Sequence, residues 1–421
     1  MYRTHPIATR LLVSATLAGL CAPANAEFLK DSKANLELRN FYFNRDFRQH
    51  NAPQNKAEEW AQGFLLRYES GFTEGTVGFG VDAIGLLGVK LDSSPDRSGS
   101  GLLQRDREAP RRAQDEYGEL GMTAKVRVSK SVLKAGTLLP KLPVLMANDS
   151  RLLPQTFEGG QLNSQEIDKL NVDLGQVRQV NQRDSTDYED MAITTGGAKN
   201  IKARSTNSDQ FNFANLTYKW SDSLNTTYGY GGLDNFYRQH FLGLNHVLAL
   251  GEGQSLKSDL RFARSLDEGG SNVDNKAFGA MFTYGIQGHA FGLGYQRMSG
   301  DTGFAYINGA DAYLVNFVQI GDFANKDEQS LQARYDFNFA SVGIPGLTFM
   351  TRYLQGDNID LGAGKPEGKE WERDTDIGYV VQSGTLKNFG IKWRNATVRT
   401  SHFGNKLDEN RLILSYSIAL W

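Results

Sequence analysis

The chain has almost no cysteine, little proline and no long apolar segment after its N-terminal region. Its 421 residues include a single cysteine, Cys21, and only 10 prolines. A chain without cysteine pairs is not a small secreted scaffold held together by disulfides. A membrane-spanning helix needs roughly 20 consecutive apolar residues, and no segment beyond residue 26 approaches that length. These absences exclude a disulfide-rich module and a helical membrane protein.

The chain also lacks an excess of either charge. The formal net charge is −2, from 46 Lys and Arg against 48 Asp and Glu. Without residues 1–26, which contain Arg3 and Arg10 but no acid, the net charge is −4. No polybasic run is present, so bulk charge gives no reason to expect a nucleic-acid partner.

The N-terminus has the features of an export signal. Arg3 and Arg10 supply a short basic region, and residues 11–20 form an apolar run too short to cross a bilayer. Ala24 and Ala26 then provide small side chains at a cleavage site of the A-x-A type. We therefore predict a cleavable secretory signal peptide over residues 1–26.

Glycine and aromatic residues are abundant, with 45 Gly, 24 Phe and 17 Tyr. The final segment, residues 411–421, alternates strictly between two kinds of side chain. One phase is apolar and the other is polar or small, as in a strand with one face in lipid; the apolar phase consists of Leu412, Leu414, Tyr416, Ile418 and Leu420. In a soluble protein this edge would be open to pairing, whereas a closed barrel in a bilayer has no open edge.

The same alternation recurs along the whole chain. We find about sixteen strands by this criterion, and residues 155–180 can hold two more, which gives the even number typical of bacterial barrels. We predict an all-β, antiparallel transmembrane β-barrel, a single domain of residues 27–421 with eighteen strands. A large β-sandwich or propeller is the soluble alternative, but no blade-length repeat supports a propeller.

The connections between the predicted strands are of two kinds. Four are polar and are expected to be solvated outer loops; they cover residues 92–116, 183–209, 301–311 and 356–373. A fifth, residues 136–160, is apolar and carries Pro140, Pro143 and Pro154. A stiff apolar loop is best buried, so we expect it to fold into the barrel and narrow a pore.

This loop also carries a resemblance to a known family. Residues 140–156 read P-K-L-P-V-L-M-A-N-D-S-R-L-L-P-Q-T and resemble the inward-folded third loop of the OprD family, the substrate-specific outer-membrane carboxylate channels. Segments 68–92, 235–239, 333–353 and 379–384 resemble the same family in the same order. The resemblance implies an eighteen-stranded pore in the outer membrane of a Gram-negative bacterium, which passes small carboxylate-bearing nutrients by facilitated diffusion.

The resemblance also implies the partners of the chain. They are small organic acid solutes, outer-membrane lipid and lipopolysaccharide, and the barrel assembly machinery, which would engage the C-terminal strand. It implies no cofactor and no nucleic acid. Whether the protein is a monomer or a trimer stays open.

The alternation predicts which cations face the lumen. Arginine suits a carboxylate because its planar fork donates two hydrogen bonds. The predicted inward cations are Arg39, Arg67, Arg127, Lys392, Arg394 and Arg411. In the family a ladder of basic residues runs up one barrel wall, and Arg127, Lys392, Arg394 and Arg411 match it best. The alternative is that each arginine only pairs with a wall carboxylate such as Glu69 or Asp82.

Acidic residues are candidates for the opposite side of the pore. Asp311 resembles the acid that the family places opposite its basic ladder, where it would bind an amine or a hydroxyl group. The alternative is that Asp311 is only an aspartate at the end of a loop, without a role in binding the solute. Asp149 and Arg151, in the apolar loop, either pair with each other or contact the solute.

The sequence favours a channel over an enzyme. No Ser/His or Asp/His set stands out, and no histidine pair has the spacing of a metal site. The acidic run 184–190 does not match a calcium-binding loop, although cation binding there stays open. We expect aromatic or cyclic monocarboxylates as solutes. The alternatives are basic amino acids or small peptides, or, in a different class, a structural or adhesion barrel.

Overall fold

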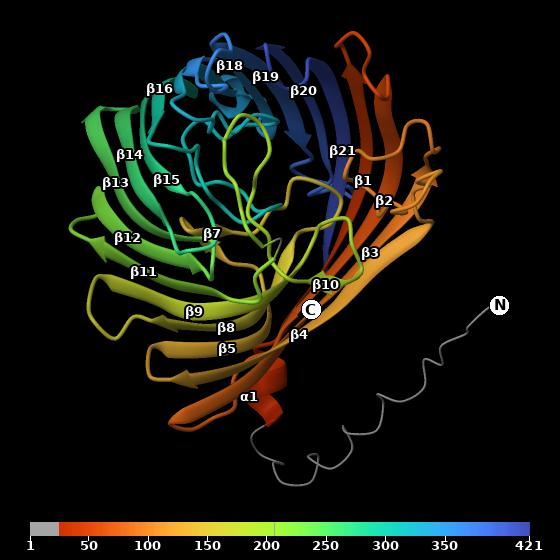
Figure 1. The fold of residues 1–421 in the computed structure, drawn as a ribbon. Helices are drawn as coiled ribbons and strands as arrows, with labels where there is room; N and C mark the ends of the chain where they lie inside the picture. The colour runs from red at the N-terminus through yellow and green to blue at the C-terminus, as the bar shows by residue number, and fades with distance from the viewer. Residues whose placement is uncertain (1–24, 206) are drawn as a thin grey trace, which may run out of the picture.

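The computed structural model describes residues 25–205 and 207–421. Most of the predicted signal peptide lies outside these residues, so its cleavage stays a prediction. Within them, eighteen antiparallel strands close into one barrel, with β21 pairing back onto β1 (Figure 1). The predicted fold and strand number are therefore confirmed, and the two weaker strands expected in residues 155–180 are β8 and β9.

The strands of the ring follow one another in chain order. They are β1 (Lys33–Phe47), β2 (Lys56–Glu69), β3 (Val77–Asp92), β4 (Glu116–Val128), β5 (Ser131–Leu138), β8 (Thr156–Ser164), β9 (Leu170–Asn181), β11 (Phe211–Lys219), β12 (Leu224–Leu233), β13 (Tyr237–Gly251), β14 (Gln254–Asp267), β15 (Asp274–Ile286), β16 (His289–Ser299), β17 (Gln329–Asn338), β18 (Leu347–Ile359), β19 (Gly368–Val380), β20 (Gly390–Ser401) and β21 (Leu407–Ala419). Neighbouring strands in this list are hydrogen-bonded, so the topology is a simple meander.

A few short elements lie outside the ring. The two-residue strand β10 (Tyr188–Glu189) pairs only with β9, while β6 (Lys141–Leu142) and β7 (Leu145–Met146) form a small separate hairpin. The described residues also contain α1 (Asn25–Lys30) and the 3-10 turn η1 (Phe339–Val342). Neither is long and apolar enough to cross a membrane.

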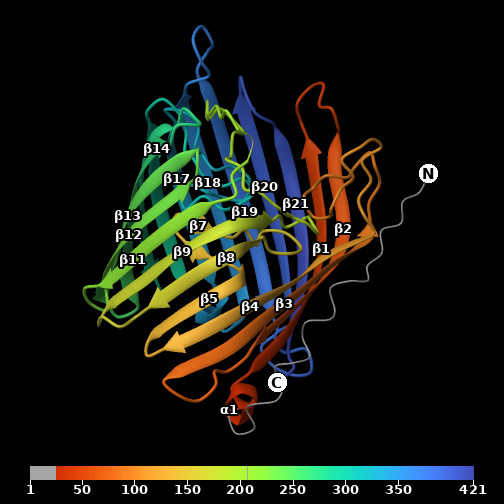
Figure 2. The same cartoon turned by 60° about the horizontal axis from the view of Figure 1, so that its bottom comes forward.

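The barrel has two unlike ends. The C-terminus and α1 lie at one end, which we call the turn end, and the longer connections rise from the other, which we call the loop end (Figure 2). Turns are tight at the turn end. Between β15 and β16, Gln287 and Gly288 both have positive φ, 46° and 86°, as a two-residue hairpin requires. A Cβ on Gly288 would lie 2.3 Å from the Ser341 hydroxyl, so no other residue fits there.

The period-two pattern separates the two faces of each strand. On β20, Ile391 and Trp393 face outward and are 42% and 39% exposed. The intervening Lys392 and the following Arg394 face the lumen. They pair in register with Gly378 and Asp376 on β19, which are on the inward face of that strand. On β21, Arg411 is only 1% exposed, because its side chain enters the packed interior.

Three loop-end connections run inside the ring (Figure 1). They are residues 139–155, 182–210 and 300–328. The apolar inward loop is shorter than the expected 136–160, because Leu138 and Phe157 still pair as β5 and β8. Pro140 and Pro154 are buried within it, and Pro143 is half-buried at the tip of the β6–β7 hairpin.

The expectation that residues 183–209 and 301–311 form solvated outer loops is wrong, and so is that for the middle of residues 92–116, where Leu102 and Leu103 are at most 1% exposed. Met191 and Ile193 of the first and Phe304 and Ile307 of the second are buried, each no more than 6% exposed. The second loop is also much longer than expected, since it reaches residue 328. Apolar side chains that face inward from neighbouring strands give both loops a surface to bury against.

The interior is divided unequally. Phe211, Phe213 and Phe241 of the wall pack with Leu145 and Ile307 of the inward loops in one large apolar cluster. This cluster fills the side of the lumen lined by β9 and β11–β16. The opposite side, lined by β18–β21 and β1–β4, carries the charged residues of the wall beside a smaller apolar cluster around Phe41, Phe43 and Leu65. Any aqueous path must therefore follow the charged wall.

Candidate functional site: the constriction

A cavity of about 510 Å³ lies where the inward loops meet the charged wall. Five arginines line it, two from loops and three from strands; they are Arg151, Arg183, Arg45, Arg394 and Arg411. Asp311, Tyr306, Phe317 and Gln319 of loop 300–328 line the facing side. The predicted residues Arg151, Asp311, Arg394 and Arg411 therefore come together at one place.

Loop 139–155 is held by an arginine of the wall. Arg39 on β1 donates to Asp149 at 2.7 Å and to the backbone oxygen of Arg151 at 2.9 Å. It also pairs with Glu37 on its own strand at 2.8 Å. Arg39 and Asp149 thus anchor the loop rather than line the cavity. Leu152, fully buried, completes the attachment.

Loop 300–328 is held by carboxylates of the wall. Glu372 on β19 accepts hydrogen bonds from the backbone N–H groups of Ile320 and Gly321, at 2.9 and 2.7 Å. Asp374, two residues further, pairs with Arg352 at 2.7 Å. Buried carboxylates need such partners, so backbone donors of this loop are fixed against β19. This anchoring brings Gln319 and Phe317 to the cavity.

Arg411 connects the wall to both loops. Its Nε donates to Glu409 at 2.6 Å, while its terminal nitrogens reach the backbone oxygens of Ser150 at 3.3 Å and Gln319 at 3.2 Å. Arg45 donates to the other oxygen of Glu409 at 2.6 Å. One buried carboxylate therefore balances two of the five arginines, and Arg411 fixes the width of the cavity.

Arg151 has no carboxylate partner among the described residues. Its Nε donates to the backbone oxygen of Ser100 at 3.2 Å, and its guanidinium lies 5.0 Å from the centre of the Phe43 ring. Burial, and then the nearby charges of Arg411 and Arg183, lower the pKa of Arg151. The guanidinium stays protonated at neutral pH, so it places in the cavity a positive charge with which an anion can pair.

Asp311 faces this positive group from loop 300–328. Burial raises the pKa of Asp311 to about 6, although the nearby charge of Arg183 opposes the rise. Its backbone N–H donates to the oxygen of Met146 at 3.0 Å, which ties the two inward loops together. Its Oδ1 is buried and accepts no hydrogen bond. The Asp311 side chain as a whole is half-buried and lines the cavity, so a donor group of a solute can contact its carboxyl there.

Arg394 enters the cavity from β20. Its Nε donates to both oxygens of Asp376 on β19, at 3.1 and 3.0 Å. The ammonium of Lys392 lies 3.8 Å from the same carboxylate, one step nearer the turn end. Asp376 therefore has two cations, and the remaining donors of Arg394 are available to a solute.

Three further predicted residues do not line the cavity, namely Arg67, Arg127 and Lys392. Arg67 pairs with Glu37 at 3.0 Å and lines a separate recess with Lys134. Arg127 makes no ion pair among the described residues, and its guanidinium lies 4.4 Å from the centre of the Phe72 ring near the turn end. Asp82, one of the wall carboxylates considered as an alternative partner for an inward arginine, pairs instead with Lys125, at 2.5 Å.

The sequence reasoning missed several residues of the cavity. Arg45 has the same strand phase as Arg39 and could have been found by extending that phase along β1. Glu409 likewise has the phase of Arg411. Arg183 gave no signal, because it lies in an irregular loop. Tyr306 was not identified, because residues 301–311 were expected to form a solvated outer loop.

The described residues contain no group of three or more His, Cys, Asp or Glu side chains placed to hold a metal ion. The acidic run 184–190, where cation binding was left open, is among them. The chemistry of the cavity is therefore that of guanidinium groups, amides and one partly buried carboxyl. Such a site can bind and orient an anion, but it has no nucleophile and base in contact.

Comparison with known proteins agrees with this geometry. Residues 26–420 match the outer membrane porin, OprD family. The chain is 38% identical over 414 residues to the porin-like protein GalP of Pseudomonas putida, covering 96% of this chain and 97% of that one. It is 37% identical to Porin D of Pseudomonas aeruginosa, covering 93% and 92%. The crystal structure of Pseudomonas aeruginosa OpdQ, 68% identical, superposes with a TM-score of 0.87 over 94% of this chain and all of that one. The chain therefore belongs to the OprD family of outer-membrane porins and is a channel rather than an enzyme.

Proposed function

We propose that this porin passes small carboxylate-bearing solutes by facilitated diffusion through the constriction. The observation that carries the proposal is the set of five arginines around one cavity of about 510 Å³. Asp311 is the described acid that lines the cavity, and the fully buried Glu409 beside it is already paired with two of the arginines. A carboxylate would gain charge-assisted hydrogen bonds and would lower the repulsion among the guanidinium groups.

The preferred solutes in this proposal are aromatic or cyclic monocarboxylates. Phe317, Val318 and the ring of Tyr306 line the cavity opposite the arginines. They give a ring an apolar surface while its carboxylate contacts Arg394 or Arg183. A long flexible dicarboxylate would place its second charge against this apolar side, which costs free energy.

A second candidate class is basic amino acids, since Asp311 places a carboxyl in the lining of the cavity. An ammonium or guanidinium group of the solute would pair with that carboxyl. A barrel with a purely structural or adhesive role would need neither the arginine-lined cavity nor two loops fixed inside the lumen, so no observation favours it.

The test is uptake into proteoliposomes containing the full-length porin, with benzoate, arginine and succinate as solutes. Fast entry of benzoate with slow entry of succinate supports the proposal. Faster entry of arginine than of benzoate supports the second candidate class. Equal entry of all three would contradict selection at the constriction.

Outside the pore, we propose two further partners. The outward phase of β21, from Leu412 to Ile418, is a candidate recognition surface for the barrel assembly machinery. Lipid and lipopolysaccharide surround the wall. Export through a cleavable signal peptide over residues 1–26 is part of the same proposal.

A further inference from the structure

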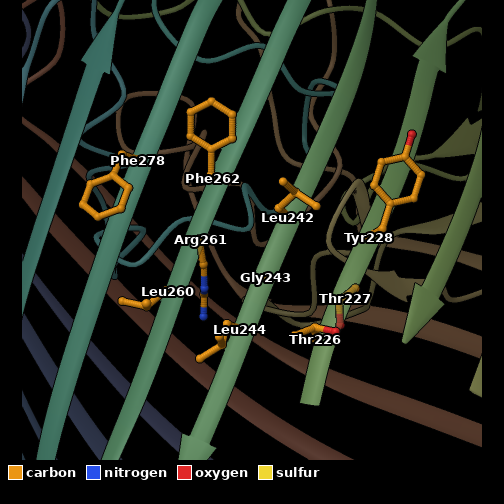
Figure 3. A pocket seen from close by; sticks show the side chains of 10 residues that line it. All are labelled: Thr226, Thr227, Tyr228, Leu242, Gly243, Leu244, Leu260, Arg261, Phe262 and Phe278. Atoms are coloured by element: carbon orange, nitrogen blue, oxygen red, sulfur yellow. The ribbon is translucent and has the colours of Figure 1, made fainter. Parts of the chain in front are cut away.

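A second cavity lies on the outside of the barrel, far from the pore. It is a shallow groove of about 330 Å³ on β12–β15. Two rows of outward side chains line it (Figure 3). The first row is Tyr228, Leu242, Phe262 and Phe278, and the second is Thr226, Leu244 and Leu260. Strand pairing places each row at one height on the wall.

Basic side chains lie one step from the groove toward the loop end. His240, Arg264 and Lys276 form one row in register, directly beyond Leu242, Phe262 and Phe278. On the next strand, Arg297 pairs in register with Phe278, and Arg238 follows two residues beyond His240. All of these residues have the outward phase, so they cannot contact a solute in the pore.

Most of this charge is not neutralised within the protein. Arg264 contacts Asp274, whereas Lys276, Arg297 and Arg238 form no ion pair among the described residues. Acidic side chains nearby are Glu268, which lies close enough to Arg238 to interact electrostatically, and Asp234 in the adjoining loop.

The basic row lies at the edge of the apolar band. Lys276 and Tyr284 are eight residues apart on β15. At about 3.4 Å per residue and a tilt of about 40°, this separates them by roughly 20 Å along the membrane normal, close to the 25 Å height of an apolar band. Tyr284 and its neighbours mark the boundary of the apolar band at the turn end. Lys276 and Arg264 therefore mark its boundary at the loop end.

The loop end of an outer-membrane barrel faces the cell exterior, because its long loops are extracellular. The basic row therefore meets the headgroups of the outer leaflet. From β13 to β16 the row spans about 14 Å, since neighbouring strands are about 4.8 Å apart. That width suits a headgroup with more than one phosphate, and the groove beneath it suits an acyl chain.

We propose that the outward surface of β12–β16 is a binding site for lipopolysaccharide. Its phosphates contact Arg264, Lys276 and Arg297, and one acyl chain occupies the groove between Leu242 and Phe262. Guanidinium and ammonium groups at a lipid surface attract phosphate. A phospholipid with a single phosphate would use only part of the row.

The test compares the purified full-length porin with the variant Lys276→Gln/Arg297→Gln. Both side chains are exposed and neither forms an ion pair among the described residues, so the barrel should fold normally. The matched control is Lys369→Gln/Arg373→Gln, which removes two outward charges from β19. Native mass spectrometry measures retention of rough lipopolysaccharide, of the same lipid after dephosphorylation, and of phosphatidylglycerol.

We expect the first variant to bind rough lipopolysaccharide roughly thirtyfold more weakly, since each of the two basic residues near a lipid surface contributes about fivefold. The control should bind as the wild type does. Equal binding by both variants, or equal retention of the dephosphorylated lipid or of phosphatidylglycerol by the wild type, would overturn the proposal.

A second variant tests the groove without changing any charge. Leu244→Trp fills the space between the two apolar rows, so it should also weaken retention of rough lipopolysaccharide. Wild-type retention by this variant would show that no acyl chain binds there. Benzoate uptake should be unchanged in all of these variants, because the altered side chains face away from the pore, and this separates the proposal from the function of the constriction.

Discussion

Arg394 is the constriction arginine whose charge can be removed with least disturbance of the fold. Its partner Asp376 keeps the ammonium of Lys392, at 3.8 Å, when the guanidinium is lost. Arg411 differs, because it also holds the backbone of Ser150 and Gln319. Effects of Arg394 on transport can therefore be interpreted as effects on the solute.

We expect Arg394→Gln to slow benzoate uptake roughly tenfold, as a charge-assisted hydrogen bond contributes about 1.5–3 kcal/mol. Arg127→Gln should reduce uptake much less, since Arg127 lies near the turn end outside the cavity. The measurement is initial uptake into proteoliposomes with equal amounts of porin. If Arg127→Gln has the larger effect, the selective step lies at the turn end instead.

We expect Asp311 to make the ion selectivity of the pore depend on pH. Its pKa is raised to about 6 by burial, so the carboxyl is ionised at pH 7.5 and mostly neutral at pH 5. The arginines stay charged over this range. Lowering the pH therefore removes one negative charge from the constriction and should strengthen its preference for anions.

The reversal potential under a KCl gradient measures this change in planar bilayers. Between pH 7.5 and 5 it should shift toward the chloride potential in the wild type. Asp311→Asn should give the acidic value at both pH values. A shift of the same size in Asp311→Asn would assign the titration to another group.

Strand phase was a sufficient guide to some of these residues and not to others. Lys392, Arg394 and Arg411 lie on strands, where alternation fixes the side of the wall. Arg183 and Asp311 lie in loops without a period, so phase gave no information about them. Arg39 shows a different limit of this reasoning. Its strand phase correctly placed the side chain inside the barrel, but the phase could not show that Asp149 pairs with the guanidinium.

At the scale of elements, the constriction depends on how the two inward loops are anchored. Loop 300–328 is attached to β19 through Glu372, which is fully buried and accepts two backbone hydrogen bonds. Hydrogen bonds of this kind contribute about 0.5–1.5 kcal/mol each. The loop should therefore be held firmly at Ile320 and Gly321.

Glu372→Ala should release this attachment and widen the pore. We expect a larger single-channel conductance with more current noise, because loop 300–328 is then free to move. Glu367→Ala, an exposed acid in the connection before β19, is the control and should leave the conductance unchanged. An unaltered conductance in Glu372→Ala would mean that Arg411 and the apolar cluster suffice to hold the loop.

The elements themselves differed in how well the sequence predicted them. Eighteen strands followed from alternation, since lipid on one side and the lumen on the other impose a period of two. The inward loop 139–155 followed from its prolines and apolar residues. Loop 300–328 was not recognised, because only its polar beginning was considered and its path depends on the cavity left by other residues.

At the scale of the whole molecule, the interior is divided between an apolar packing region and a charged wall. Phe211, Phe241 and Ile307 fill one side, so water and solute are confined to the side of β18–β21 and β1–β4. The outer surface has its own division, with an apolar band and a basic row at the outer-leaflet edge. We propose that the two divisions serve different ligands, one in the pore and one in the membrane.

The central claim is that the arginine-lined constriction selects carboxylates by charge. Proteoliposome uptake of benzoate and of benzamide, which has a similar shape but no charge, tests it most directly. In the wild type we predict benzoate entry roughly tenfold faster than benzamide entry, and in Arg183→Gln/Arg394→Gln we predict that this ratio falls to about one. A wild type that admits both solutes equally, or a double variant that keeps the preference for benzoate, would contradict the claim.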